Sequence, residues 1–255
     1  EWWSGDEARA RESFLAPGLS AAIWSPRDHQ VDNRAVVEAL QAGVRKHQGR
    51  LHENTPIKAV EPDARRPAVV TAAGERVEGD TVVVAAGAWS RSIDGLDGAL
   101  PIRPVKGEAM VLSTTPTFDL RHVVRGPEAY VVPKNDGRVV VGATAEEKGF
   151  NDDVTAGGLY ENLEGGWEVV PGLLDLAVDC TCASFRPASR DNAPVLGPAA
   201  PGVVAATGHY RHGVLLTPVT AQEIARYVQT GTLSDWVEPF QPARFDTVSS
   251  DVARA

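Results

Sequence analysis

Residues 81–90 read TVVVAAGAWS, and this stretch decides the fold class of the chain. It begins as a continuous apolar run, whereas a strand with one face in water alternates apolar and polar residues. A continuous run predicts a strand buried on both faces, as in a parallel sheet covered by helices. Small residues follow it, and they let a ligand approach the backbone at the carboxyl end of the strand. On this segment alone, a structural turn and a ligand site explain the pattern equally well.

A similar pattern lies near the other end of the chain, where residues 203–216 read VVAATGHYRHGVLL. We expect a strand, a glycine turn and a helix that continues through residues 224–228. The turn before a helix exposes unpaired N–H groups and the positive end of the helix dipole, which attract anionic or electron-rich groups. The two histidines of this turn are more often structural than catalytic, and we predict no metal site.

The middle of the chain, residues 101–187, has a different pattern. Strand-like runs cover residues 108–113, 130–134, 138–144 and 177–185. Asn135-Asp136-Gly137 separates two of them, which is typical of a hairpin and therefore of an antiparallel sheet. Residues 155–170 are a candidate helix, although four glycines weaken that prediction.

The region before residue 81 contains further elements. We expect an amphipathic helix over residues 32–49, with Val36, Val37, Leu40 and Val44 on one face, and a strand around residues 51–60. Short strands follow at residues 69–71 and 76–78. The predicted fold class is therefore α/β (α+β): a Rossmann-like layer interrupted by an antiparallel sheet.

Composition excludes several classes of function. The chain of 255 residues carries 34 acidic against 25 basic residues, a net charge of -9, which is the wrong sign for binding nucleic acid. Its longest apolar stretch, residues 81–89, is far shorter than the ~20 residues that span a bilayer, so we expect a soluble protein. Its two cysteines, Cys180 and Cys182, form neither a disulfide framework nor a zinc site, which fits the cytoplasm.

Arg186 is a candidate ligand for a carboxylate. Strand periodicity places it on one face with Cys180, Cys182 and Ser184, three small residues that leave space around its guanidinium. A guanidinium can hold a carboxylate through two hydrogen bonds. Taken alone, however, an arginine before proline is more often a surface residue. The sequence also has no Gly-x-Gly-x-x-Gly, Walker, Gly-x-Ser-x-Gly or His-Glu-x-x-His motif.

Several segments, taken in order, resemble the D-amino-acid-oxidase family of FAD-dependent amine oxidoreductases, and within it the glycine oxidases of thiamine biosynthesis. The resemblance extends over about residues 16–240. The segments are Thr55-Pro56-Ile57, residues 82–90, Pro104-Val105-Lys106-Gly107-Glu108, Tyr130-Val131-Val132-Pro133, Gly142-Ala143-Thr144, Phe185-Arg186-Pro187 and residues 208–218.

The resemblance implies FAD as cofactor, with the adenine near Ile57 and the flavin under the turn before the last helix. The cofactor-binding residues that it implies are Ile57, Ala86, Gly87, Trp89, Gly208, His209, Tyr210, Arg211, His212, Gly213, Val214 and Leu215. It implies that Arg186 holds the carboxylate of a small amino acid or amine, with Tyr130 and Arg211 beside it. Glu128 stands on the same side, where its charge would oppose a carboxylate. No residue is assigned as a catalytic acid or base.

The implied reaction is hydride transfer from substrate to flavin, with molecular oxygen as final acceptor and an imine or keto acid, ammonia and hydrogen peroxide as products. A sarcosine-oxidase-like enzyme or an amino-acid dehydrogenase is the alternative within the class. A non-catalytic or incomplete subunit without FAD is the alternative outside it. A homo-oligomer, the preferred amino acid and the mode of flavin attachment stay open.

The resemblance also predicts how the chain is organised. Residues 1–22 would end a helical part of the substrate domain, residues 23–100 and 186–243 would belong to the FAD-binding domain, residues 101–185 would form the antiparallel substrate domain, and residues 244–255 a tail. The family's N-terminal strand, glycine loop and helix have no match, and Glu1–Gly18 resembles the middle of a family member. We therefore expect a fragment of a longer enzyme.

Overall fold

The structure, a computed structural model, describes residues 1–96 and 98–248. It divides into two compact units. Unit 1 contains Glu1–Lys46 and Lys106–Ser184, and unit 2 contains His47–Val105 and the described residues from Phe185 onwards. No helix in these described ranges has both the length and the apolar character needed to cross a membrane.

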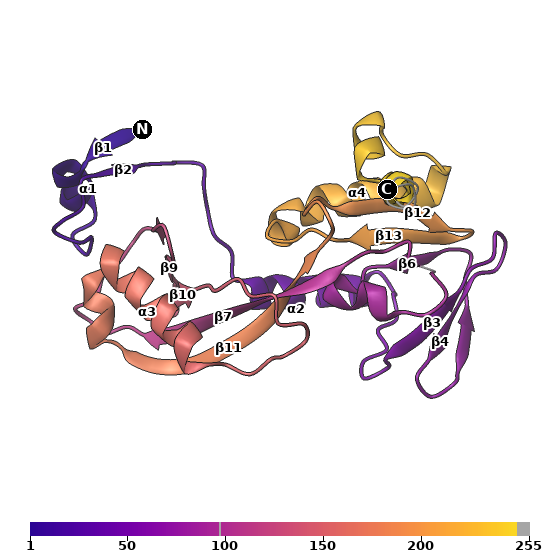
Figure 1. Cartoon of the computed structure of the whole chain (residues 1–255), viewed down its shortest axis with the longest axis horizontal. Helices are drawn as coiled ribbons and strands as arrows, with labels where there is room; N and C mark the ends of the chain where they lie inside the picture. Colours follow the sequence, from indigo (N-terminus) through magenta and orange to yellow (C-terminus); the bar gives the residue numbers. More distant parts are fainter. Residues whose placement is uncertain (97, 249–255) are drawn as a thin grey trace, which may run out of the picture. The chain divides into compact units, whose positions relative to one another are not determined.

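The main feature of unit 1 is a five-stranded sheet with the order β11-β7-β10-β9-β8 (Figure 1). Its strands are β7 (Arg103–Ser113), β8 (Val124–Arg125), β9 (Tyr130–Pro133), β10 (Arg138–Gly142) and β11 (Ala177–Ala188), of which β7 and β11 continue into unit 2. The β7–β10, β10–β9 and β9–β8 pairs are antiparallel. The hairpin predicted at Asn135-Asp136-Gly137 is confirmed, because β9 and β10 pair on either side of it.

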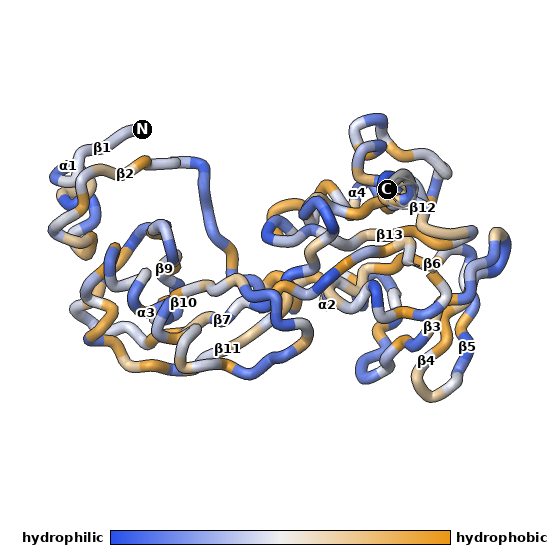
Figure 2. The backbone as a smooth tube through the Cα atoms, viewed as in Figure 1, coloured by the Kyte–Doolittle hydropathy of each residue, from blue (hydrophilic) through white to orange (hydrophobic). Residues whose placement is uncertain are grey.

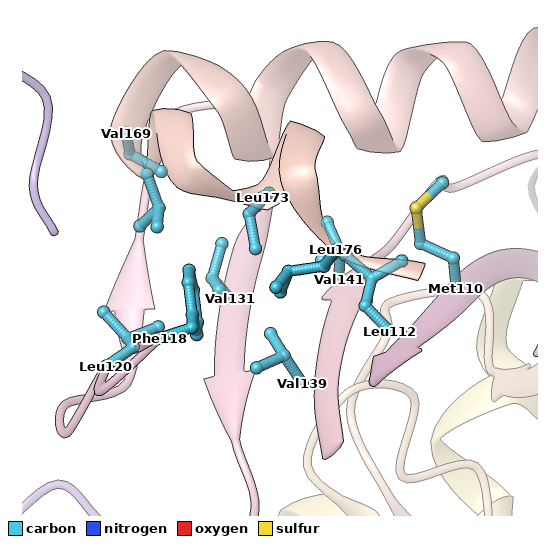
Figure 3. Close-up of a cluster of buried hydrophobic side chains, with 11 residues drawn as sticks. Met110, Leu112, Phe118, Leu120, Val131, Val139, Val141, Val169, Leu173 and Leu176 are labelled. Atoms are coloured by element: carbon cyan, nitrogen blue, oxygen red, sulfur yellow. The ribbon is translucent and has the colours of Figure 1, made fainter. Parts of the chain in front are cut away.

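One face of this sheet is covered by α3 (Ala156–Val169) and the 3-10 helix η2 (Pro171–Asp175). Their side chains form a core with those of the strands, in which Val131, Val139 and Val141 are fully buried (Figure 3). The glycines of α3 have a packing role. A Cβ at Gly166 would lie 2.9 Å from both Leu173 and Val141, so the missing side chains let the helix lie close to the sheet.

Unit 1 also contains a two-stranded sheet of β1 (Trp2–Ser4) and β2 (Ala21–Ile23), joined through α1 (Gly5–Arg11). The side chain of Ser4 caps α1 and that of Glu7 reaches back to the backbone of Ser4, which is a capping box. The predicted amphipathic helix is confirmed as α2 (Asn33–Lys46). None of its residues is buried, and the side chains of Val37 and Leu40 are each 54% exposed.

Unit 2 contains the parallel pair that the sequence predicts. The short strand β6 (Val82–Val84) runs parallel to β13 (Val203–Thr207), which pairs antiparallel with β12 (Val195–Ala200) on its other side. Apolar residues dominate these strands (Figure 2). Burial of β6 on both faces is wrong, because Val84 is buried but Val83 is 42% exposed. Val83 faces a groove rather than a covering helix.

Unit 2 also contains a second sheet and several helical elements. A three-stranded antiparallel sheet consists of β3 (Ile57–Glu61), β4 (Ala68–Thr71) and β5 (Arg76–Glu78). The helical elements are α4 (Gly213–Thr230) and the 3-10 helices η1 (Gly87–Ser92), η3 (Asp235–Phe240) and η4 (Pro242–Val248). The strand expected around residues 51–60 begins only at Ile57. The core of this unit includes Val60, Val84, Ile102, Val195 and Val203.

Candidate functional site

The two glycine turns singled out in the sequence lie side by side in unit 2. The parallel register pairs Val84 with Ala205, so the two strands end at the same edge of the sheet and both turns begin there. The hydroxyl of Thr207 hydrogen bonds to the carbonyl of Gly87 at 3.1 Å, which joins one turn to the other. Open α/β sheets bind ligands at this edge, because the carboxyl ends of the strands and the start of a helix meet there.

Both turns depend on glycine for their backbone conformation. Gly87 has φ of 54° and Gly208 has φ of 75°, values that side-chain-bearing residues rarely adopt. A Cβ at Gly208 would lie 2.9 Å from the side chain of Val195. Tyr210, with φ of 48°, adopts the same strained region without being glycine, and such strain is concentrated at functional sites.

An apolar groove of about 790 Å³ lies between the β6–β13 pair and α4. Its lining includes the small residues Ala85, Ala206 and Gly213. The first hydrogen bond of α4 runs from the N–H of Leu216 to His212, so the preceding N–H groups are not used by the helix. An apolar groove of this size with a few polar groups in its lining is typical of a cofactor site.

His209 is half-buried and lines this groove. Its Nε2 lies 2.9 Å from the hydroxyl of Thr220 in α4, and its backbone bridges to Ala188 at the end of β11. Burial lowers the pKa of His209, because the low-dielectric surroundings disfavour the charged ring. His209 therefore connects the turn to α4 through its side chain and to β11 through its backbone.

The turn also lies against the segment that contains Arg186. The N–H of Tyr210 donates to the carbonyl of Pro187 at 2.8 Å. Arg186 is thus one residue away from a direct backbone contact with the predicted cofactor turn, and its side chain is partly buried. Arg211 is exposed, and its guanidinium lies 5.3 Å from the ring of Tyr210.

Aromatic packing joins the first turn to the same segment. The rings of Trp89 and Phe185 meet edge to face, with centroids 5.9 Å apart, and Trp89 remains 54% exposed. Ile57 lies on β3 and is 38% exposed. Of the predicted cofactor residues, His209, Gly213 and Val214 line the groove and the others do not. The structure therefore gathers the predicted cofactor residues other than Ile57 around the two turns and the start of α4.

Tyr130 belongs to unit 1, on β9. Its register partner is Gly142 of β10, and an added Cβ at Gly142 would lie 3.0 Å from the Tyr130 hydroxyl and 3.2 Å from its ring. The ring thus lies over the backbone of Gly142. Its neighbour Val131 is buried in the core under α3, so Tyr130 projects from the opposite face of the sheet.

Sequence reasoning gave no role to four residues of this arrangement: Ser90, Thr207, Thr220 and Gly142. Ser90 and Thr207 are each 1% exposed, and their hydroxyls hold the turns together. No spacing rule reveals them, because they pair across 117 residues of sequence. Gly142 carried a signal, since a glycine inside a strand marks a place where another group approaches the backbone.

The residues present fit FAD in part. The groove offers apolar walls, small residues and the N–H groups at the start of α4, which suit a flat ring that gains negative charge. Gly208 and the residues up to Leu215 would hold the flavin, with Ala86, Gly87 and Trp89 beside it. A glycine-rich loop for the pyrophosphate is not among these residues.

Comparison with known proteins agrees with this geometry. The bifunctional protein ThiO/ThiG of Synechocystis sp. is 32% identical over 98% of this chain, which covers 38% of that protein. The glycine oxidase of Bacillus licheniformis is 30% identical over 97% of this chain, which covers 68% of it. The crystal structure of glycine oxidase from Geobacillus kaustophilus superposes with a TM-score of 0.88 at 30% identity, covering 96% of this chain and 66% of that one.

The family of FAD dependent oxidoreductases, abbreviated DAO, matches residues 1–227. The chain spans between about two fifths and two thirds of the relatives named above. With the matched residues extending through both units and including both glycine turns, the chain belongs to the DAO family of FAD dependent oxidoreductases.

Proposed function

We propose that this chain forms the substrate-binding part and much of the cofactor-binding part of an FAD-dependent amino-acid oxidase. The proposed substrate is glycine or another small amino acid or amine, and the proposed pathway is thiazole formation in thiamine biosynthesis. The observation that carries the proposal is the hydrogen bond from Thr207 to Gly87, which holds two glycine turns together at the ligand-binding edge of a parallel sheet. Glycine oxidases at about 30% identity support the choice of substrate.

Arg186 is proposed to hold the substrate carboxylate through charge-assisted hydrogen bonds, and the Tyr130 hydroxyl to add a further one. Arg211 is proposed to lie beside the substrate. Fixing the carboxylate orients the Cα–H bond for transfer, so the protein contributes positioning rather than a base. When bound, FAD supplies the hydride acceptor. No protein base is needed if the amine binds in its neutral form.

The start of α4 is proposed to stabilise charge. Its unused N–H groups and the positive end of its dipole favour negative charge that develops nearby during reduction. The neutral state of His209, which burial favours, adds no positive charge that varies with pH at this point. The products from glycine would be glyoxylate, ammonia and hydrogen peroxide, with oxygen and water consumed.

The test is an anaerobic titration of the complete, flavin-loaded oxidase that contains this chain with glycine, sarcosine and a larger D-amino acid, followed by visible absorption. Bleaching by glycine and peroxide formation on adding air are expected. Bleaching by sarcosine alone would favour a sarcosine-oxidase-like enzyme, and reduction without peroxide would favour a dehydrogenase. Failure of the complete oxidase that contains this chain to bind flavin under any condition would contradict the proposal.

The role of Arg186 is tested separately. Arg186→Ala loses charge-assisted contacts worth about 1.5–3 kcal/mol, so KM should rise about 10- to 100-fold. Arg190→Ala is the matched control, because Arg190 belongs to the same segment and its guanidinium lies 5.7 Å from the ring of Phe245. An unchanged KM in Arg186→Ala would remove this residue from the substrate site.

A further inference from the structure

The negative charge of the chain is concentrated in one segment of unit 1. Residues 146–179 contain nine acidic residues and one basic residue, Lys148, so they carry -8 of the chain's net charge of -9. The segment comprises the loop before α3, α3 itself, η2 and the start of β11. The ammonium of Lys148 lies 2.5 Å from the carboxylate of Glu146 and neutralises that residue. The remaining acidic residues surround one helix without a basic residue among them.

The outer face of α3 combines aromatic rings with carboxylates. Helical periodicity places Leu159 and Leu163 against the core of the five-stranded sheet, which leaves the opposite side of the helix in solvent. The exposed side, here called the outer face, consists of Tyr160, Glu161, Glu164, Trp167 and Glu168. Its two large rings are well exposed, Tyr160 at 63% and Trp167 at 46%.

The carboxylates of the outer face do not stabilise the helix. Glu161, Glu164 and Glu168 follow one another at i, i+3 and i+7, so each repels the next on the same side of the helix. Glu168 also adds negative charge at the end where the helix dipole is already negative, and the last turn contains no basic residue. In the part of the chain that the structure describes, neither Glu161 nor Glu168 has a cationic partner. Folding does not account for these charges, but a cationic partner would.

Glu164 and Trp167 together suit a guanidinium group. They are neighbours on the helix surface, because they lie three residues apart. The hydroxyl of Tyr160 donates to Oε1 of Glu164 at 2.5 Å and holds the carboxylate in place. The same hydrogen bond raises the pKa of the Tyr160 hydroxyl, so it keeps its proton at neutral pH. A planar guanidinium can stack on an indole while it donates to a carboxylate, whereas an ammonium is a compact point charge. The pair therefore favours arginine over lysine.

The spacing of the three carboxylates matches a helix rather than a strand. Along the axis of α3, Glu161 and Glu164 are about 4.5 Å apart, and Glu164 and Glu168 are about 6 Å apart. Alternate residues of an extended strand are about 6.6–6.8 Å apart and do not reproduce the shorter interval. Residues i, i+4 and i+7 of an antiparallel helix reproduce both intervals.

We propose that the outer face of α3 docks a helix of another protein that carries arginines at i, i+4 and i+7. The middle arginine stacks on Trp167 and pairs with Glu164, and the outer two pair with Glu161 and Glu168. A second copy of this chain does not fit, because its α3 carries the same negative charge. None of the four described α-helices has arginines at this spacing. The proposal concerns unit 1 alone and does not depend on the oxidase reaction.

The test uses the complete oxidase that contains this chain and three labelled, alanine-based peptides of about 20 residues, long enough to form helices. The first has arginines at i, i+4 and i+7, the second has the same composition with arginines at i, i+2 and i+5, and the third has lysines at the positions of the first. Fluorescence anisotropy is measured at low ionic strength, because salt screens exposed charges.

The first peptide is expected to bind at least tenfold more tightly than the second and about two- to fivefold more tightly than the third. Equal binding of the first and second peptides would indicate general electrostatic attraction and overturn the proposal. Equal binding of the arginine and lysine peptides would overturn the stacking on Trp167. Absence of binding by the first peptide at about 1 mM would overturn the proposal as a whole.

Variants of the oxidase locate the binding surface. Trp167→Leu keeps an apolar side chain but removes the ring, and it should weaken binding of the first peptide at least twofold. Glu164→Gln should weaken it several-fold. Asp152→Asn is the matched control, because it makes the same change of charge in the exposed loop before α3 and should leave binding unchanged. Equal weakening by Asp152→Asn and Glu164→Gln would overturn the proposal.

Glu168→Gln separates binding from a structural role. It should weaken binding several-fold and yet raise the melting temperature, because it removes a charge that opposes the helix dipole. A lower melting temperature in this variant would show that the carboxylate serves the fold, and would overturn the proposal.

Discussion

The side-chain oxygens of Ser90 and Thr207 lie 2.8 Å apart in the interior of unit 2, and both lie within hydrogen-bond distance of the Gly87 carbonyl. Each hydroxyl has one proton to donate. One hydroxyl can therefore donate to the Gly87 carbonyl while the second donates to the oxygen of the first. This small cluster joins the ends of β6 and β13, strands that are more than a hundred residues apart. It joins the two turns of the candidate site.

Removal of either hydroxyl should destabilise unit 2. Thr207→Val and Ser90→Ala should each lower the free energy of unfolding by about 1–3 kcal/mol, because a buried partner loses a hydrogen bond. The double variant should cost less than the sum of the two, since the groups form one network. Urea unfolding of the four proteins measures this coupling, and strictly additive costs would contradict the network.

Two adjacent glycines of α3 should respond in opposite directions to alanine. A Cβ at Gly158 would lie 2.3 Å from a carboxylate oxygen of the buried Glu108, whereas a Cβ at Gly157 meets nothing within 4 Å. Gly157→Ala should stabilise by about 0.5–1 kcal/mol, the difference in helix propensity. Gly158→Ala should destabilise the protein, because the close approach to Glu108 outweighs the same gain in helix propensity. Thermal unfolding of the two variants provides the comparison, and equal melting temperatures would be inconsistent with the packing described.

The buried ion pair of Lys106 and Glu108 should be sensitive to loss of one partner. Their side chains are 0% exposed and 2.7 Å apart. Burial raises the pKa of Glu108, but hydrogen bonds from Lys106 and Thr155 outweigh this effect and lower the pKa below its usual value. Lys106→Met should lower the free energy of unfolding by about 3–5 kcal/mol, because it leaves the buried carboxylate of Glu108 without its cationic partner. The double variant Lys106→Met/Glu108→Leu should recover much of the loss, and denaturant titration at pH 7 tests both.

His209 should make the stability of unit 2 depend on pH. Burial lowers its pKa in the folded state, so the unfolded chain binds a proton more readily. The associated stability is complete above the unfolded pKa of about 6.5 and is lost progressively as the pH falls below it. In His209→Gln, the slope between pH 7 and pH 5 should decrease. Chemical unfolding at several pH values, with exposed His47→Gln as control, measures the change.

Gly142 should control the position of Tyr130. The Cβ of Gly142→Ala would come within 3.2 Å of the Tyr130 ring and of Ala109, so the tyrosine has to shift by a few tenths of an ångström. If Tyr130 binds substrate, KM should rise several-fold while the visible spectrum of bound flavin is unchanged. Gly43→Ala, where no atom lies within 4 Å, is a control for glycine replacement in the same unit. An unchanged KM alongside a shifted Tyr130 would exclude this tyrosine from the site.

Local signals predicted much of the secondary structure. The Asn135-Asp136-Gly137 turn, the glycine turn after β13 and the amphipathic pattern of α2 all give elements where the sequence places them. They succeed because turn chemistry and helical periodicity act over a few residues. The same reasoning undervalued α3, since propensity counts four glycines as a weakness and cannot see that Gly158 and Gly166 permit close packing.

The sequence by itself determined the class of elements, the two glycine turns and the family, because those features reside in short segments and in their order. Tertiary structure alone decided which distant groups meet. It brought Ser90 to Thr207 and His209 to Thr220. It also decided that Val83 lines a groove, although its apolar run predicted burial. Hydrophobic pattern specifies which residues favour an apolar environment, whereas the fold decides which surfaces are available to cover them.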